Sequence, residues 1–316
     1  IVAISTALLS VLHVVNRENK LFGRIIGSAA PTIIIGLALY ILIVKRGKKV
    51  SIQYWKYALP ICMPFIPHVL SLTLLNSMDK MMITKIRGAE ENALYSVAYS
   101  CGAIITLLVT SMNTAFSPWL GEKLNSKSYE EIKKVSKPYI MLFTYVACGI
   151  MLLSPELLLF MGGKSYSDAV YAMPPVAFGC ICQFLYTLYV NVEQFSKRTI
   201  GMAIASALAA LSNFILNSFL IPIYGYIAAS YTTLASFMLL LFIHMLIVRK
   251  MGLQQIYPTK IIFSVLAFMC AYMIFINLLY MLTIVRYVIL FLYLAISLCL
   301  LVKHRNELIN FIRHKT

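Results

Sequence analysis

The chain has 316 residues, of which 61% are hydrophobic and 12% are charged, and its mean hydropathy is +0.84. Soluble globular domains carry about 25% charged residues, so this composition excludes an ordinary soluble fold and indicates a membrane protein with several spanning segments. The net charge of +16 does not indicate a nucleic-acid partner, because the basic residues lie in short loops between apolar segments, where they act as topology signals.

The apolar residues form ten segments, which we expect to be helices. They cover residues 1–16, 25–44, 58–86, 93–120, 138–161, 169–192, 199–221, 227–248, 259–281 and 287–302. From Thr199 to Val248 there is no Asp, Glu, Lys or Arg, and one helix of that length would far exceed the ~30 Å hydrocarbon core. We therefore expect the chain to fold back at residues 222–225. Long apolar segments predict an all-α polytopic membrane protein rather than a β-barrel.

The Lys and Arg residues are distributed unequally between alternate loops. Nineteen of the 27 lie on the side that holds residues 45–56, 123–137 and the C-terminus, and eight lie on the other side. Because cytoplasmic loops carry the excess of basic residues, this bias predicts a multi-pass membrane protein with a cytoplasmic C-terminus. The chain begins with Ile1 inside an apolar run, and we expect it to be a fragment that has lost N-terminal helices.

The third segment combines prolines with ionisable residues at membrane depth. The prolines, which predict kinks, are Pro60, Pro64 and Pro67. Asp79 and Lys80 follow where a membrane helix would normally still be apolar, and His68 shares a helical face with Asp79. Such groups are costly in a membrane and usually face a cavity or a partner. Two interpretations stay open: Asp79 has a functional role, or it pairs with a base and fixes helix packing.

The fourth segment carries a stripe of polar and small residues at the helical period. The stripe comprises Tyr95, Tyr99, Gly102, Thr106, Thr110, Asn113 and Ser117. Steps of three and four residues place all of them on one face. The pattern fits a helix interface and an aqueous cavity equally well.

Residues 121–137 predict a short amphipathic helix between the fourth and fifth segments. Ser128 and Glu131 have the spacing of a capping box, and Pro138 marks the expected break before the next segment. We expect this helix to be a solvated connector.

Single polar residues also occur within the sixth to eighth segments. Glu193 lies beside Lys197 and Arg198, where we expect an ion pair at the surface. His244 stands alone on an apolar helix, and we expect a neighbouring helix to satisfy it. The seventh segment carries polar and small residues on one face, which we interpret as a helix contact rather than a site. They are Ser206, Ala210, Asn213 and Asn217.

The sequence has no recognisable catalytic motif. Residues 162–165 read Gly-Gly-Lys-Ser, but the first glycine of a phosphate-binding loop would fall at Leu158. Cys180 and Cys182 have no second pair of ligands that would make a metal site. We therefore expect a protein that is not an enzyme, with no catalytic residues, no metal and no cofactor.

The stretch from Tyr54 to Ser100 resembles the polysaccharide biosynthesis proteins that flip lipid-linked oligosaccharide repeat units. Its matching motifs are Leu59-Pro60, Pro67-His68, the run from Asp79 to Ile83 and the run from Tyr95 to Tyr99, with Phe116 to Trp119 and Asn213 to Gly225 further along. These O-antigen and capsule flippases belong to the multidrug/oligosaccharidyl-lipid/polysaccharide exporter superfamily. The similarity extends over the whole chain.

The resemblance implies a MATE-like fold of two six-helix lobes around a central cavity, with an extra helix pair. Residues 1–57 would then be the last two helices of the first lobe with a cytoplasmic linker. Residues 58–250 would be the complete second lobe, and residues 251–316 the extra pair with a basic cytoplasmic tail. The first four helices of the fold would be absent.

The resemblance also implies a substrate, a polyprenyl-diphosphate-linked oligosaccharide that is flipped for lipopolysaccharide O-antigen or capsule assembly. Partners would be this lipid-linked oligosaccharide, membrane lipid and other polysaccharide assembly proteins. A hydrated cationic cavity would suit the diphosphate and the sugar, and the candidate substrate-binding residues are Lys80, Lys85, Arg87, His68, Tyr95, Tyr99 and Asn113. Asp79 is the candidate for coupling to H⁺ or Na⁺, because protonation would remove its charge. Related families usually carry Arg where this chain has Lys80, which keeps the charge but loses a bidentate fork.

Three alternatives remain beside a flippase. A cation-coupled multidrug antiporter of the same superfamily should have mainly acidic residues in its cavity, whereas here bases balance the acids. A membrane-embedded glycan polymerase or ligase should have a large polar loop with paired catalytic groups, and no loop here is long enough. A purely structural membrane subunit is the third.

Overall fold

The computed structural model describes residues 20–47 and 51–303. Within these ranges the regular structure is helical and contains no strand. The helices are α2 (Lys20–Gly47), α3 (Ile52–Cys62), α4 (Phe65–Arg87), α5 (Ala89–Asn125), α6 (Tyr129–Leu152), α7 (Ser154–Gly162), the 3₁₀ helix η1 (Lys164–Ala172), α8 (Met173–Phe195), α9 (Thr199–Lys250), α10 (Thr259–Met281) and α11 (Thr283–Lys303).

The described helices include 8 stretches that are long and apolar enough to cross a membrane. They account for the second to tenth expected segments, because the seventh and eighth form the two arms of α9. The first expected segment, residues 1–16, lies outside the described residues. The expectation of an all-α polytopic membrane protein is therefore confirmed.

The chain divides into two compact units, Ile1–Leu59 and Pro60–Thr316. The first contains α2 and most of α3, and the side chains of α2 after Pro31 are largely exposed. The second contains α4 to α11 and the main hydrophobic core. The division at residues 57 and 250 that the resemblance implies stays a prediction.

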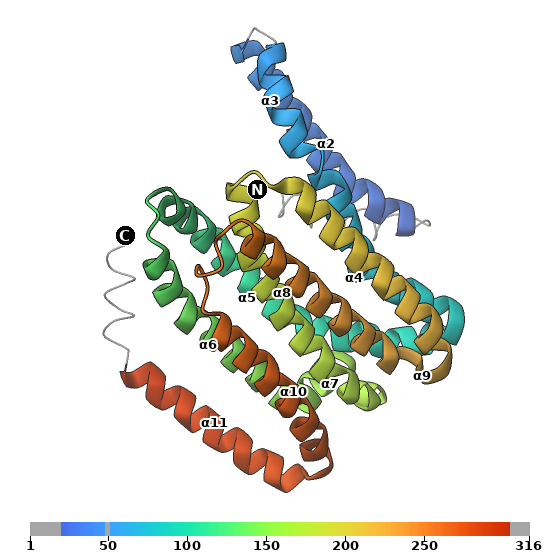
Figure 1. Ribbon diagram of the computed structural model, residues 1–316. Helices are drawn as coiled ribbons and strands as arrows, with labels where there is room; N and C mark the ends of the chain where they lie inside the picture. The colour runs from blue at the N-terminus through green and yellow to red at the C-terminus, as the bar shows by residue number, and fades with distance from the viewer. Residues whose placement is uncertain (1–19, 48–50, 304–316) are drawn as a thin grey trace. The chain divides into compact units, whose positions relative to one another are not determined.

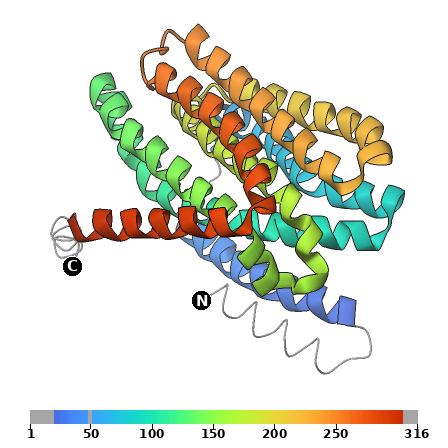
Figure 2. The same ribbon diagram turned by 90° about the horizontal axis from the view of Figure 1, so that it is seen from below.

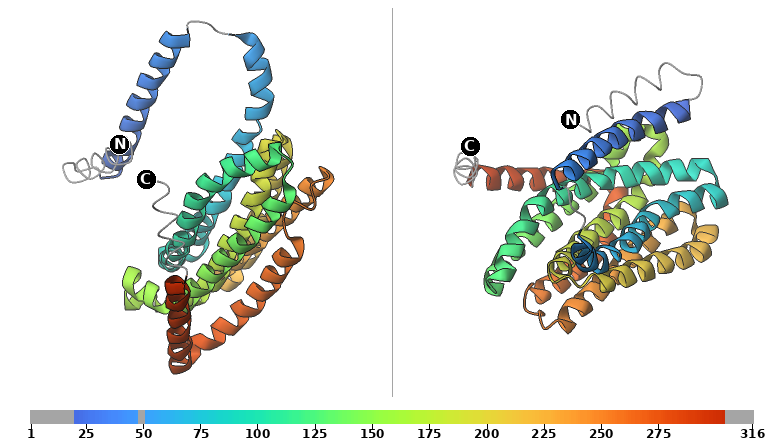
Figure 3. Two further views of the ribbon diagram at one scale, coloured as in Figure 1. Left: turned by 90° about the vertical axis from the view of Figure 1, so that its left-hand side faces the viewer. Right: turned by 90° about the horizontal axis from the view of Figure 1, so that it is seen from above.

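In the second unit the long helices lie side by side around α8 (Figure 1). Nearly every side chain of α8 is buried, including Phe178, Phe184 and Leu185. A helix that is apolar on all sides belongs in the centre of a bundle. Figure 3 shows α4 lying along both arms of α9, which brings residues far apart in the sequence into contact.

The fold-back in α9 is confirmed, and it occurs at Gly225. This residue has φ 65° and ψ −150°, a backbone region that is essentially restricted to glycine. Pro222 stays within the first arm. The two antiparallel arms meet at the end of the bundle where Figure 1 labels α9.

The proline-rich third segment is interrupted once. The helix breaks at Pro64, between α3 and α4, as expected for one of the three prolines. Pro67 lies in the first turn of α4, where proline is tolerated because no backbone donor is lost. Pro60 lies inside α3.

The expected amphipathic connector at residues 121–137 is wrong. Helix α5 continues to Asn125, and α6 begins at Tyr129 and runs through Pro138 without a break. Ser128 precedes α6, yet within the described part of the chain its side chain makes no capping bond; its hydroxyl lies 2.9 Å from that of Ser126. The connection is therefore a tight turn between two long helices.

Helix α11 runs across the direction of most other helices in this unit (Figure 2). It contacts α6 through Tyr293, whose ring stacks on Tyr145 with centroids 4.5 Å apart. Arg286 anchors its first turns by a two-bonded ion pair with Glu156 of α7, at 2.7 and 2.6 Å.

Candidate functional site

Helix α4 presents one buried face that contains Asp79. The residues of this face recur every three or four positions, as expected for one side of a helix. They are His68, Ser71, Leu75, Asp79 and Ile83. The exposed fraction of Asp79 is 0%, so its carboxyl group is cut off from bulk water.

Donors from α5 and from both arms of α9 bind the carboxyl group of Asp79. The hydroxyl of Tyr95 donates to Oδ2 at 2.6 Å, and the amide of Asn217 donates to Oδ1 at 2.6 Å. The hydroxyl of Thr233 also donates to Oδ2. Asn213 completes the group, because it accepts from Asn217 at 3.0 Å and donates to Thr233 at 3.2 Å. We refer to these five residues as the Asp79 cluster.

The groups that bind the carboxyl group of Asp79 are neutral. None of the ion pairs among the described residues includes Asp79, and the groups that act on its carboxyl are hydroxyls and amides. The interpretation in which Asp79 pairs with a base is therefore wrong. The cluster instead gathers carboxyl, amide and hydroxyl oxygens in a dry place, and such hard oxygen donors suit a proton or a small hard cation.

Lys80 lies beside the cluster on a more exposed face of α4. Its ammonium group lies 4.8 Å from the centroid of the Tyr99 ring, within the range of a cation–π interaction. The hydroxyl of Tyr99 donates to Asn76 at 2.8 Å. The rings of Tyr95 and Tyr99 are 5.8 Å apart, so this face adjoins the Asp79 cluster directly.

The other expected site residues lie elsewhere. Lys85 and Arg87 are exposed, and Arg87 pairs with Glu91 at 2.8 Å. His68 is buried three turns away from Asp79 and contacts the carbonyl of Met202 at 3.2 Å. The structure therefore brings Asp79, Lys80, Tyr95 and Tyr99 together, but not Lys85, Arg87, His68 or Asn113, which bonds to Asn191 of α8 at 2.7 Å.

Most of the polar stripe of α5 lies against neighbouring helices. Tyr95 and Tyr99 bond to α4. Thr106 lies 3.7 Å from the sulfur of Cys180. A methyl group at Gly102 would collide with Val176, so glycine here permits close contact between α5 and α8. For these residues the helix-interface interpretation is confirmed, whereas Thr110 is exposed and bonds to its own helix.

Sequence reasoning missed the partners of Asp79. Asn213 and Asn217 were expected to form a helix contact, and Thr233 was not singled out. The available signal was two amides one turn apart on an otherwise apolar helix. Their role depends on Asp79, which only packing brings to them.

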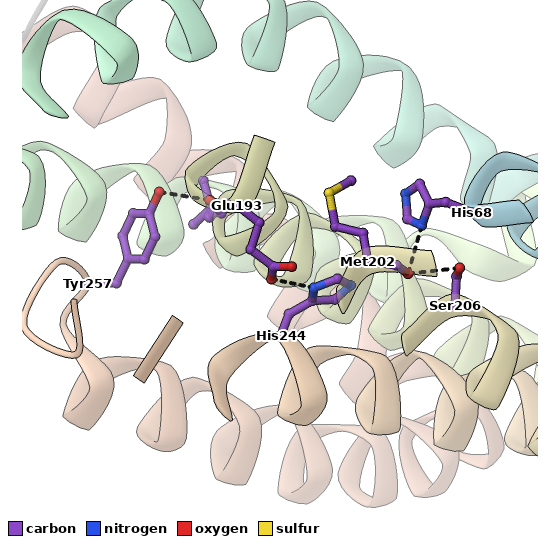
Figure 4. A network of polar contacts seen from close by, with 7 residues as sticks. His68, Glu193, Met202, Ser206, His244 and Tyr257 are labelled. Atoms are coloured by element: carbon purple, nitrogen blue, oxygen red, sulfur yellow. Dashed lines mark hydrogen bonds and ion pairs between the residues drawn. The ribbon is translucent and has the colours of Figure 1, made fainter. Parts of the chain in front are cut away.

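The expected surface ion pair of Glu193 with Lys197 and Arg198 is also wrong. The side chain of Glu193 has an exposed fraction of 0% and bonds to His244 at 2.6 Å (Figure 4). The expectation that a neighbouring helix satisfies His244 is thereby confirmed. Since α8 is buried on every side, its last turn carries Glu193 inwards.

Comparison with protein families gives two matches. The MatE family matches residues 64–219, and the family described as polysaccharide biosynthesis protein matches residues 1–124. The two matches overlap over residues 64–124, which include Asp79, Lys80 and Tyr95. No curated protein and no solved structure matches the chain significantly. Both families agree with the resemblance found in the motifs, and the chain belongs to the superfamily of membrane exporters and flippases that includes MatE and the polysaccharide biosynthesis proteins.

Proposed function

We propose that this exporter flips a polyprenyl-diphosphate-linked oligosaccharide across the bacterial cytoplasmic membrane for O-antigen or capsule assembly. It would act as a transporter rather than an enzyme, in contact with membrane lipid and with other assembly proteins. The observation that carries the proposal is the junction of a buried acid without a basic partner, Asp79, and a half-buried base on an aromatic ring, Lys80 on Tyr99.

Asp79 is the proposed coupling group. A carboxylate in a dry interior carries an uncompensated charge, and binding of H⁺ or Na⁺ would neutralise it. Its bonds join α4, α5 and both arms of α9. Loading or emptying the cluster therefore changes the contacts between four helical segments, which is the kind of differential interaction that shifts a lobe between two arrangements.

Lys80 and Tyr99 are the proposed first contacts of the substrate. An ammonium group attracts a diphosphate, and the half-buried ring of Tyr99 offers an aromatic surface for sugar rings. Exposed Arg87 and Lys85 add positive potential at the same end of α4. Tyr95, His68 and Asn113 stay candidate contacts, although their present bonds are to protein groups.

A cation-coupled multidrug antiporter is the second candidate, and the MatE match favours it. A buried acid without a base suits a cationic drug as well as a proton. The ammonium of Lys80 argues against it, because it would repel a cation on the face next to Asp79.

The test is deletion of the full-length gene in its host, followed by complementation with wild type, Asp79→Asn, Lys80→Gln and the exposed control Lys134→Gln. Surface polysaccharide and lipid-linked repeat units in the inner leaflet are quantified. The flippase predicts lost surface glycan and accumulated inner-leaflet intermediates in the deletion strain, restored by wild type and the control but not by the two site variants. Normal glycan with new sensitivity to cationic drugs would assign the protein to the antiporters.

A further inference from the structure

A second buried acid lies far from Asp79. Glu193, in the last turn of α8, and His244, on the second arm of α9, both have an exposed fraction of 0%. Oε1 of Glu193 lies 2.6 Å from Nδ1 of His244 (Figure 4). Among the described residues, Oε2 of Glu193 and Nε2 of His244 have no hydrogen-bond partner. Each residue of the pair therefore has one buried polar atom without a hydrogen-bond partner among the described residues.

Titratable groups from several elements surround the pair. The ring of Tyr186, about two turns before Glu193 on α8, stacks on His244 with centroids 5.8 Å apart. His68 of α4 is close enough to His244 for the two imidazoles to interact electrostatically. Tyr257, before α10, uses its hydroxyl on the carbonyl of Leu188. Lys197 and Arg198 follow in the turn between α8 and α9.

A cavity of about 910 Å³ adjoins the pair at this end of the bundle. Lys197, Arg198 and Lys250 are among the residues that line it, and Gly201 and Ile247 form part of its wall. A methyl group built on Gly201 would lie 3.7 Å from Oε2 of Glu193 and 3.1 Å from Cδ1 of Ile247. The missing side chain of Gly201 therefore leaves the free carboxyl oxygen directly behind the cavity wall.

We propose that Glu193 and His244 form a proton-binding site that holds one proton and exchanges it with water of this cavity past Gly201. With one proton the pair is neutral overall, either as carboxylic acid with imidazole or as carboxylate with imidazolium. Without it the pair has a net charge of −1, which a dry interior opposes. The proton leaves from the carboxyl oxygen or from Nε2 to a water molecule, and no other bond changes.

This site is distinct from the Asp79 cluster. Gly201 and Asn217 lie on the same arm of α9, sixteen residues or about 24 Å apart along its axis. The two acids therefore lie toward opposite ends of the bundle. By the distribution of basic residues, the Glu193 end faces the cytoplasm. The basic side chains of the cavity stabilise the deprotonated pair once water enters, so the site releases its proton when this end opens.

The competing interpretation is a fixed bond that only holds α8 against α9. A fixed bond keeps its protonation across the accessible pH range, whereas a proton site titrates. This difference does not depend on which substrate the protein exports. The proton-site proposal can therefore be disproved without disproving the proposed flippase function, and the reverse.

The first test is a pH titration of purified full-length protein in lipid nanodiscs, followed by infrared difference spectroscopy and by ¹⁵N NMR of labelled histidine. We expect one carboxylic acid or one imidazolium signal to disappear as the pH rises, and to be absent in E193Q and H244Q. The signal should persist in D79N, which separates it from Asp79. A wild-type spectrum without a titrating signal at Glu193 or His244 would overturn the proposal.

The second test addresses the route through Gly201. We expect Gly201→Ala to slow hydrogen–deuterium exchange of the Glu193–His244 proton several-fold, because its methyl group covers Oε2. Ile247→Ala should accelerate the exchange, since it removes the nearest atom on the other side. Gly179→Ala is the matched control, because a methyl group there meets only ordinary contacts with Phe237 and Leu234. Equal exchange rates in all three variants would contradict access past Gly201.

Discussion

The carboxyl group of Asp79 and the amide of Asn217 lie 2.6 Å apart across the contact between α4 and the first arm of α9. Tyr95 reaches the same carboxyl group from α5 at 2.6 Å. A buried acid that is bound only by neutral donors from different helices ties those helices together, and in its ionised form it has a net charge that a cation can neutralise. The bonds between the helices and the proposed ion coupling therefore involve the same group, and different substitutions separate them.

Asp79→Ala should destabilise the protein strongly. The substitution leaves the hydroxyls of Tyr95 and Thr233 buried without an acceptor, and each such loss costs about 1–3 kcal/mol. The amide of Asn217 loses one acceptor and keeps its bond to Asn213. Thermal unfolding of the purified protein in detergent measures the effect. Asp168→Ala is the control, because Asp168 is exposed and accepts the hydroxyl of Tyr226 through its backbone carbonyl, which the substitution keeps. Equal midpoints for the two variants would show that the bonds to Asp79 carry no stability.

Asp79→Asn should retain most of the fold but remove ion coupling, because an amide keeps the size of the side chain and cannot gain or lose a proton. We expect substrate transport by the wild type to respond to external pH or Na⁺, and the residual transport of the variant to be insensitive to both. Uptake into inverted membrane vesicles at several pH values and Na⁺ concentrations measures this. A variant with normal export and a normal pH profile would exclude Asp79 as the coupling group.

Gly225→Ala should destabilise the hairpin of α9. An alanine at φ 65° and ψ −150° is strained by about 1–3 kcal/mol. Its methyl group would also collide with the Glu91 carboxylate, which accepts the N–H of Tyr226 at 3.0 Å. The thermal midpoint should fall, while Gly36→Ala should leave it nearly unchanged, because no described atom lies within 4 Å of that position. Matching midpoints for the two variants would argue against strain at the turn.

The ion pair between Glu156 and Arg286 should make the attachment of α11 sensitive to acid. Burial raises the pKa of Glu156, but the hydrogen bonds and charge of Arg286 outweigh it, so that the pKa lies below its ordinary value of 4.5. A lowered pKa in the folded state means that the pair stabilises above the ordinary value and that this stabilisation is lost as the pH falls through the folded pKa.

We therefore expect the thermal midpoint of the wild type to fall as the pH drops from neutral through this range, and Glu156→Gln to flatten part of that decline. Glu130→Gln is the control, because the Glu130–Lys133 pair is long, at 3.8 Å, and Glu130 is 82% exposed. If Glu156→Gln follows the wild-type curve at every pH, the ion pair does not contribute to the decline.

The C-terminus should be cytoplasmic. The side of the membrane that carries most Lys and Arg includes the tail, whereas Lys164 belongs to the opposite side. A reporter that is active only in the cytoplasm should be active when fused after Thr316 and inactive when fused after Lys164. The reverse result would invert the topology and place the cavity beside Glu193 outside the cell.

The sequence singles out a residue as a site candidate where that residue violates its local pattern. Asp79 and Lys80 are visible because an ionisable residue in an apolar segment is costly wherever its helix packs. The sequence does not single out Asn213, Asn217 and Thr233, because neutral polar residues are common in membrane helices. Nothing in the local sequence shows which of these residues contact one another. The partner of Glu193 was predicted wrongly because Lys197 and Arg198 are near it in the sequence, whereas its actual partner, His244, is on the second arm of α9.

Membrane embedding, most of the helical stretches and the reversal of the chain near Gly225 could be inferred from the sequence alone. Hydropathy and helix length are sums over neighbouring residues, and a glycine-only backbone conformation is a property of one position, so all three can be read locally. Packing of the helices, by contrast, set the course of α6 through Pro138, gave Asp79 its neutral partners and turned Glu193 inwards to His244. Those outcomes depend on the depth and rotation of each helix against its neighbours, and these are fixed when the whole bundle packs.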